Sequence, residues 1–127
     1  MNFADSISDA KRLQTEGNLR FSAYAALLVK AGVESFTVQV STLATKFSGR
    51  KGENYQDRGG VPRSVADAYD AKAIDAAVRM NQRGELENPA FMYRLAAAGV
   101  SSFETRLDDG VIVYEGHGSS YAESIRR

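Results

Sequence analysis

Apolar residues at the start of this chain follow a helical spacing, and the spacing defines two helices. Ile7, Ala10 and Leu13 recur at loosely helical intervals, which predicts a helix over residues 6–16 with Ser6 as its cap. Residues 22–31 place apolar side chains at i, i+3, i+4 and i+7, as one face of a second helix requires. Gly17 and Gly32 follow these segments and are the expected helix ends.

After Gly32 the apolar residues alternate with polar ones, which is the spacing of a strand with one buried face. Phe36, Val38 and Val40 alternate with Thr37 and Gln39. Strands are therefore expected over residues 36–40, 44–48 and 53–56.

The same pattern returns 67 residues later. Three blocks superimpose without a gap: Ile7 on Ile74, Ala31-Gly32-Val33 on Ala98-Gly99-Val100, and Ser35-Phe36 on Ser102-Phe103. Glycines mark turns and apolar spacing marks a buried face, so the repeated signal concerns the fold.

The second half therefore predicts the same series of elements. Asp70 is expected to cap one helix, and Asn88 with Pro89 to begin another that Gly99 ends. Asp109-Gly110 predicts a two-residue hairpin turn. The expected strands are residues 103–107, 111–114 and 121–125.

Together these elements predict an α+β fold made of two tandem helix-helix-strand-strand(-strand) repeats with pseudo-twofold symmetry. Strands with one polar face favour an antiparallel sheet that helices cover on one side. We expect one domain over residues 1–127, in which repeats of about 6–56 and 70–125 share a core, because about 60 residues alone would be marginally stable. Gly59, Gly60 and Pro62 mark the connector between the repeats.

Composition narrows the chemistry that the chain can perform. It has no cysteine and one histidine, which excludes disulfides, thiolate nucleophiles, cysteine zinc sites and sites with two histidines. Its 16 basic and 16 acidic residues balance, so it has no overall attraction for nucleic acid or anionic membrane. The N-terminus does not have the pattern of a secretory signal, and we expect a cytoplasmic protein without a cofactor or bound metal.

The second half resembles a known family. RGELENPAFMYRLAAAGV is an aromatic helix ending in Ala-Gly-Val, and SSFETRLDDGVIVYEGHG has an aromatic residue opening a strand, an Asp/Gly turn and a tyrosine in the return strand. This pattern resembles a small bacterial family of unknown function that is often labelled "phage envelope protein" (YbcV-like). The resemblance covers nearly the whole chain and implies no established activity, cofactor or catalytic residue.

His117 is the first candidate for a functional residue, because its side chain ordinarily titrates near neutral pH. One hypothesis makes it a general base for Ser119 or Ser120, and the other makes it a solvated turn residue between two glycines. Tyr93 and Arg94 are further candidates for ligand binding, because the first half has Ala26 and Leu27 at these positions. Their alternative interpretation is an exposed helix face.

A basic segment around the connector is a candidate for binding nucleic acid. Its basic residues are Lys46, Arg50, Lys51, Arg58 and Arg63. Phe47 and Tyr55 lie among them, and basic and aromatic residues on a sheet can hold single strands. The alternative is a solvated edge whose charge discourages aggregation.

The repeated structural pattern favours a non-enzymatic binding or protein-interaction module, acting on a protein partner or as a homodimer. A small hydrolase or transferase that uses the His117 turn is the alternative. A weakly nucleic-acid-associated protein that uses residues 46–63 is the second alternative.

Overall fold

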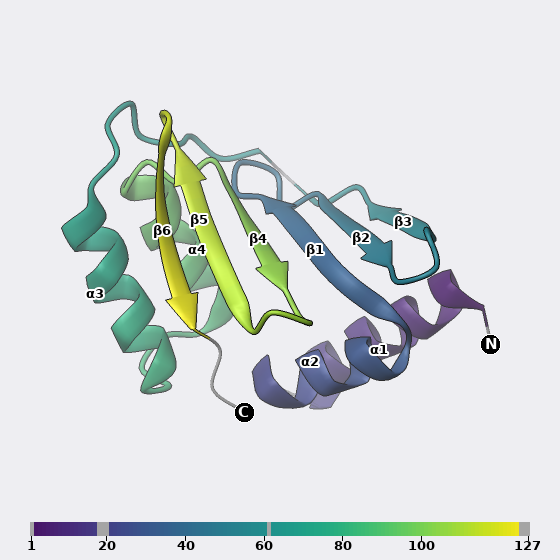
Figure 1. Cartoon of the computed structure of the whole chain (residues 1–127). Helices are drawn as coiled ribbons and strands as arrows, with labels where there is room; N and C mark the ends of the chain where they lie inside the picture. Colours follow the sequence, from purple (N-terminus) through teal and green to yellow (C-terminus); the bar gives the residue numbers. More distant parts are fainter. Residues whose placement is uncertain (1, 18–20, 61, 125–127) are drawn as a thin grey trace.

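The computed structural model describes residues 2–17, 21–60 and 62–124 and contains four helices and six strands in these ranges (Figure 1). The first half contains α1 (Phe3–Gly17), α2 (Phe21–Lys30), β1 (Val33–Gln39), β2 (Thr45–Gly49) and β3 (Asn54–Asp57). The second half contains α3 (Ala71–Gln82), α4 (Asn88–Ala97), β4 (Ser102–Arg106), β5 (Val111–Gly116) and β6 (Ser119–Ser124). Ile125, which the sequence placed in the last strand, lies outside the described residues.

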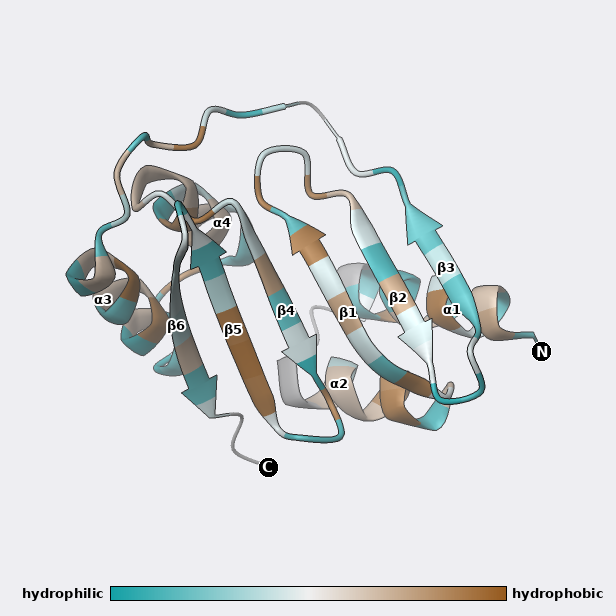
Figure 2. Cartoon of the chain, turned by 45° about the horizontal axis from the view of Figure 1, so that its top comes forward, coloured by the Kyte–Doolittle hydropathy of each residue, from teal (hydrophilic) through white to brown (hydrophobic). Residues whose placement is uncertain are grey.

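All six strands form one antiparallel sheet in the order β3-β2-β1-β4-β5-β6. The four helices lie on one face of this sheet, and among the described residues no helix covers the other face (Figures 1 and 2). The predicted α+β class with an antiparallel sheet covered on one side is confirmed.

The two halves meet where β1 pairs with β4 at the centre of the sheet. Thr37 lies opposite Glu104 in this pair, and these two positions coincide when the sequence is shifted by 67 residues. The same shift carries the bounds of α2, 21–30, onto those of α4, 88–97. From this central pair, the first half continues outward as β1-β2-β3 and the second half as β4-β5-β6, so each half adds its strands in chain order toward its own edge.

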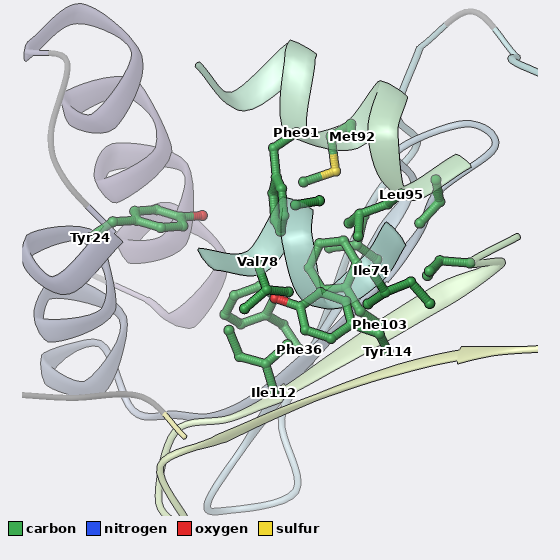
Figure 3. Close-up of a cluster of buried hydrophobic side chains, with 14 of the residues drawn as sticks. Tyr24, Phe36, Ile74, Val78, Phe91, Met92, Leu95, Phe103, Ile112 and Tyr114 are labelled. Atoms are coloured by element: carbon green, nitrogen blue, oxygen red, sulfur yellow. The ribbon is translucent and has the colours of Figure 1, made fainter. Parts of the chain in front are cut away.

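The core lies between the sheet and the helices. Alternate residues of the central strands, including Phe36, Phe47, Phe103 and Tyr114, face the helices and are buried. Figure 3 shows Phe91, Met92 and Leu95 of α4 above the side chains from β4 and β5. The ring of Phe91 meets that of Tyr114 edge-on, with the ring centroids 6.2 Å apart.

The helix ends follow the predicted glycines. Gly32 and Gly99 have φ angles of +95° and +86°, which L-residues rarely adopt. At the end of α4, Gly99 N–H donates to Ala96 O at 3.1 Å and Val100 N–H donates to Leu95 O at 3.0 Å. These two bonds form a Schellman motif. Asp70 caps α3 as predicted, because its side chain accepts from Ala73 N at 3.1 Å.

Four details of the prediction were wrong. Helix α1 begins at Phe3, since Asn2 Oδ1 accepts from Asp5 N at 2.8 Å and replaces Ser6 as the cap. Leu13 is 39% exposed instead of buried. The N-cap position of helix α4 is Glu87, one residue before the predicted Asn88, and its side chain makes no capping hydrogen bond.

The fourth error concerns the β4–β5 hairpin. Arg106 pairs with Val111, so the loop has four residues, 107–110, in place of a two-residue Asp109-Gly110 turn. Gly110 has a φ of +69°, whereas a type I′ turn needs positive φ at both central residues. Leu107, which is buried, donates its backbone N–H to Glu34 O at 3.0 Å and so continues the pairing of β4 with β1 beyond the last β4–β5 pair.

The connector between β3 and α3 runs along one end of the sheet (Figure 1). Toward the first half, Gly60 N donates to Thr42 O at 2.7 Å and Arg63 N donates to Ser41 O at 2.6 Å. Toward the second half, Ala66 N and Asp70 N donate to Ala96 O and Ala98 O, at 2.9 and 2.8 Å. The Tyr69 hydroxyl donates to Tyr114 O at 2.9 Å. The described part of the connector is therefore bonded to both halves.

Candidate functional site

His117 occupies the tight turn between β5 and β6. Gly116 pairs with Ser119, which leaves His117 and Gly118 as a two-residue loop. Their φ angles are +50° and +80°, so the turn is of type I′. His117 is exposed at this turn, as one of its two predicted interpretations required.

The imidazole of His117 is bonded to the connector. Its Nε2 lies 2.8 Å from Ala66 O, and a carbonyl oxygen can only accept, so Nε2 carries the proton. With the proton on Nε2, Nδ1 is the nitrogen that could act as a base, and among the described residues neither Ser119 nor Ser120 donates a hydrogen bond to it. The bond to Ala66 O ties the β5–β6 hairpin to the residues that precede α3.

A hollow of about 590 Å³ lies beside this turn, on the uncovered face of the sheet over β4, β5 and β6. Its lining residues are Ser101, Ser102, Arg106, Val113, Glu115, Gly116, His117, Gly118, Ser119, Ser120 and Ala122. All of them belong to the second half, and the hollow is shallow and open to solvent. It brings His117 together with one carboxylate, Glu115, from the strand that leads into the same turn.

Arg106, the cationic side chain of the hollow, is engaged with a neighbour. Arg106 Nε donates to Glu104 Oε1 at 2.6 Å, and this bond raises the pKa of the guanidinium above its ordinary value. Ser101 donates its hydroxyl proton to Glu115 O at 3.1 Å. The hollow therefore offers serine hydroxyls and a paired arginine to a polar ligand.

The basic segment does not form one surface. Lys46 and Arg58 lie toward the end of the β2–β3 pair where Thr45 faces Asp57, whereas Arg50 and Lys51 lie in the loop at its other end. Arg50 Nη2 pairs with Asp108 Oδ1 at 2.5 Å, which offsets its charge. Arg63 lies in the connector, where its Nε is buried without a hydrogen-bond partner among the described residues.

The aromatic residues of this segment also face away from solvent. Phe47 is 1% exposed, and Tyr55 packs against the same core from β3. The two ring centroids are 6.0 Å apart on the helix-covered face. Stacking of bases needs exposed aromatic faces, which these two residues do not provide.

Tyr93 and Arg94 lie on the outward face of α4. The opposite face of this helix carries Phe91, Met92 and Leu95 into the core, so both candidates point to solvent. Tyr93 is 70% exposed, and the other large apolar or aromatic side chains described as exposed, Leu13 and Val29, reach 39% and 37%. Since α4 lies on the helix-covered side, the structure does not bring Tyr93 and Arg94 together with the hollow beside His117.

A cluster of phenols and carboxylates between α3 and β6 was missed by the sequence analysis. Tyr114 donates to Glu123 Oε1 at 2.6 Å, and Gln82 Nε2 donates to Glu123 Oε2 at 2.8 Å. Burial, followed by the charge of Glu123, raises the pKa of the Tyr114 hydroxyl far above its ordinary value. Tyr121 donates to Asp75 Oδ1, and this bond, followed by that from Arg79, lowers the pKa of Asp75.

This cluster joins a helix to the edge of the sheet. Alternation along a strand places Tyr121 and Glu123 on one face, but their partners on α3, Asp75 and Gln82, are about forty residues away in sequence. Among the described residues no group of three histidine, cysteine, aspartate or glutamate side chains is arranged to hold a metal ion.

Comparison of the sequence with known families identifies the family to which the chain belongs. Residues 13–120 match the family described as "Protein of unknown function (DUF1398)", and the chain belongs to this family. No curated protein sequence matches the chain. The family match does not address the phage-envelope label. Within the described residues, no helix has both the length and the apolar character needed to cross a membrane.

Proposed function

We propose that this protein is a non-enzymatic interaction module that binds a protein partner through the outward face of α4. The observation that carries the proposal is Tyr93, whose side chain is 70% exposed on an ordered helix. A tyrosine that is held by a helix and is not used in the core can bury its large ring in a partner at little entropic cost.

The neighbour of Tyr93 strengthens the proposal. Arg94 is exposed beside it, and tyrosine and arginine are enriched among the residues that dominate binding energy in protein interfaces. The corresponding helix α2 has Ala26 and Leu27 at these positions, and Leu27 is partly buried against the core. Of these two corresponding helices, only α4 therefore carries an exposed tyrosine next to an exposed arginine.

The chemistry of this pair indicates what the partner presents. A phenol ring with one polar tip fits an apolar recess that has a hydrogen-bond acceptor at its rim. The guanidinium of Arg94 fits a carboxylate next to that recess. We therefore expect a protein surface with an apolar hollow and an acidic side chain. The cytoplasmic location expected from the sequence is part of this proposal.

Co-purification followed by titration tests the proposal. Proteins that co-purify with the full chain from its native host are identified, and the purified partner is titrated by calorimetry. Tyr93→Ala should weaken binding at least about tenfold, equivalent to about 1.4 kcal/mol, and Arg94→Glu should weaken it further through repulsion. Lys72→Ala on α3, also at an exposed helical position, is the matched control and should bind as the unchanged chain does. A partner that binds Tyr93→Ala with full affinity would refute the proposal.

The geometry gives less support to the two alternatives. A hydrolase would need a serine hydroxyl to donate to Nδ1 of His117, because Nε2 carries the proton, and no such bond from Ser119 or Ser120 is present among the described residues. Nucleic-acid binding would need a shared basic surface, but Arg50 and Lys51 lie at the opposite end of the strand pair from Arg58. Titration with fluorescent single-stranded oligonucleotides at about 0.15 M salt should show little binding. Tight binding that charge reversal at Arg50 and Lys51 abolishes would favour the nucleic-acid alternative instead.

A further inference from the structure

The outer edge of β6 carries backbone groups that the sheet does not use. Gly116 and Ser119 close a two-residue hairpin, so they form a hydrogen-bonded pair, and the pairs Tyr114–Tyr121 and Ile112–Glu123 follow in alternation. The residues between them, Ser120, Ala122 and Ser124, direct their N–H and C=O groups away from β5. The position of Glu115 agrees, because its carbonyl accepts from Ser101 N at 2.8 Å on the β4 side.

This edge has few of the features that commonly protect a terminal strand. Protein edges are usually blocked by a charged side chain, a proline, a bulge or a very short strand. The one charged side chain of β6, Glu123, is bonded within the chain to Tyr114 and Gln82. β6 has six residues in unbroken register with β5, and its outward positions carry small, uncharged side chains. At the other edge, β3 has four residues and is followed by Arg58.

We propose that the free edge of β6 pairs antiparallel with β6 of a second copy, about a twofold axis at Ala122. In this register Ala122 lies opposite the second copy's Ala122, and Ser120 lies opposite the second copy's Ser124. Each of these pairs exchanges two backbone hydrogen bonds, because all three residues direct their backbone groups outward. The two sheets become one continuous sheet with the helices of both copies on the same face.

The sequence of the edge identifies a second copy as its occupant. A twofold axis at Ala122 places serine against serine on both sides of the axis, with no charge opposed on the uncovered face. On the helix side, Tyr121 lies opposite the second copy's Glu123. A phenol thus faces a carboxylate, and no two carboxylates face each other. Tyr121 and Glu123 are already held from within the chain by Asp75 and Gln82, so the strand is ordered before it pairs.

The chain already pairs two corresponding strands antiparallel at its centre. There β1 and β4 lie side by side with Thr37 opposite Glu104, and each is the innermost strand of a unit of two helices and three strands. The β6 pair would instead join two chains through their outermost strands. Pairing through one short strand gives a small interface, so we expect a dimer that dissociates on dilution.

Cysteine cross-linking of the full chain tests the register, since the natural sequence has no cysteine. Ala122→Cys places two thiols on residues whose Cα atoms are about 5.5 Å apart, within the range of a disulfide. Ser120→Cys is the matched control on the same edge, because its counterpart lies four residues along the strand, about 13 Å away. On mild oxidation Ala122→Cys should form covalent dimer at least tenfold faster than Ser120→Cys. Equal rates for the two variants would overturn the proposal.

Charge exchange provides a second, independent measurement. Sedimentation equilibrium over a hundredfold dilution series should show the unchanged chain approaching twice its monomer mass. Ala122→Lys and Ala122→Glu should each stay monomeric, and their equimolar mixture should recover the dimer. Gln56→Glu, exposed at the opposite edge, should dimerise as the unchanged chain does, and thermal melts followed by circular dichroism check that every variant is folded. An unchanged chain that is monomeric throughout, or a dimer that Ala122→Lys leaves intact, would overturn the proposal.

Discussion

Replacing Gly99 and Gly32 with alanine separates backbone strain from steric conflict. Both glycines end corresponding helices with similar φ angles, +86° and +95°. A Cβ added at Gly32 meets no heavy atom within 4 Å. A Cβ added at Gly99 would lie 2.2 Å from Ala68 O and 2.8 Å from Ala68 C, which are backbone atoms of the connector.

The expected cost follows from these contacts. Positive φ alone costs an alanine about 1 kcal/mol, which is the whole expected effect of Gly32→Ala. At Gly99 the connector must also move, and Ala66 N and Asp70 N are bonded there to Ala96 O and Ala98 O. Weakening those bonds, at about 1 kcal/mol each, brings the expected cost of Gly99→Ala to about 3 kcal/mol.

Urea unfolding followed by circular dichroism measures both costs, provided that the dependence on urea is unchanged between variants. Gly118→Ala, with a φ of +80° and no heavy atom near its added Cβ, is a second control and should resemble Gly32→Ala. Equal losses at Gly99 and Gly32 would show that the connector yields freely, and the steric reasoning would be wrong. A loss near zero at both would contradict the strain argument as well.

Three further predictions concern the core and the α3–β6 contact. We expect the two halves to form one cooperative domain, so residues 1–66 alone should be unfolded by circular dichroism, and a monomeric half-chain with a cooperative melt would contradict this. Thr105→Val should raise the free energy of unfolding by about 1 kcal/mol, because Thr105 Oγ1 is buried with no hydrogen-bond partner among the described residues and the corresponding residue is Val38; a loss in chemical denaturation would mean that the hydroxyl is satisfied. Bonds from Tyr121 and Arg79 lower the pKa of Asp75, so its ionised form stabilises the fold above the unfolded pKa of about 3.9, and this stabilisation is lost as the pH falls further. The urea midpoints of the unchanged chain and of Asp75→Asn should therefore differ at neutral pH and converge in acid. A difference between the midpoints that stays constant with pH would refute the stabilising role of ionised Asp75.

Local signals predicted most of the secondary structure because they act within a few residues. Gly32 and Gly99 ended their helices, and Asp70 capped α3, since each depends on backbone groups close in sequence. The β4–β5 turn was predicted from Asp109-Gly110 alone and was wrong. That dipeptide does not indicate that Leu107 is buried in the core and bonded to Glu34 of β1, a residue far away in sequence.

The candidate sites depended almost wholly on distant contacts. Arg50 forms an ion pair with Asp108, 58 residues away, and His117 is bonded to Ala66, 51 residues away. Neither partner is marked by spacing or composition. The comparison of corresponding positions singled out Tyr93, which the structure leaves exposed, because a tyrosine on an outward helix face needs no distant partner to become exposed. Its role in binding stays a prediction.

The bonded connector has a consequence for what a break in the chain would do. A linker that only spans two halves allows them to separate once it is cut. Here the described residues on the first-half side of the connector bond to Ser41 and Thr42, and those on the second-half side bond to Ala96 and Ala98. A single cleavage beside the exposed Gly59 and Gly60 would leave β1 paired with β4, so the two fragments are expected to remain one particle under native conditions. Covalent continuity between the halves is thus required for assembly more than for holding the assembled protein together.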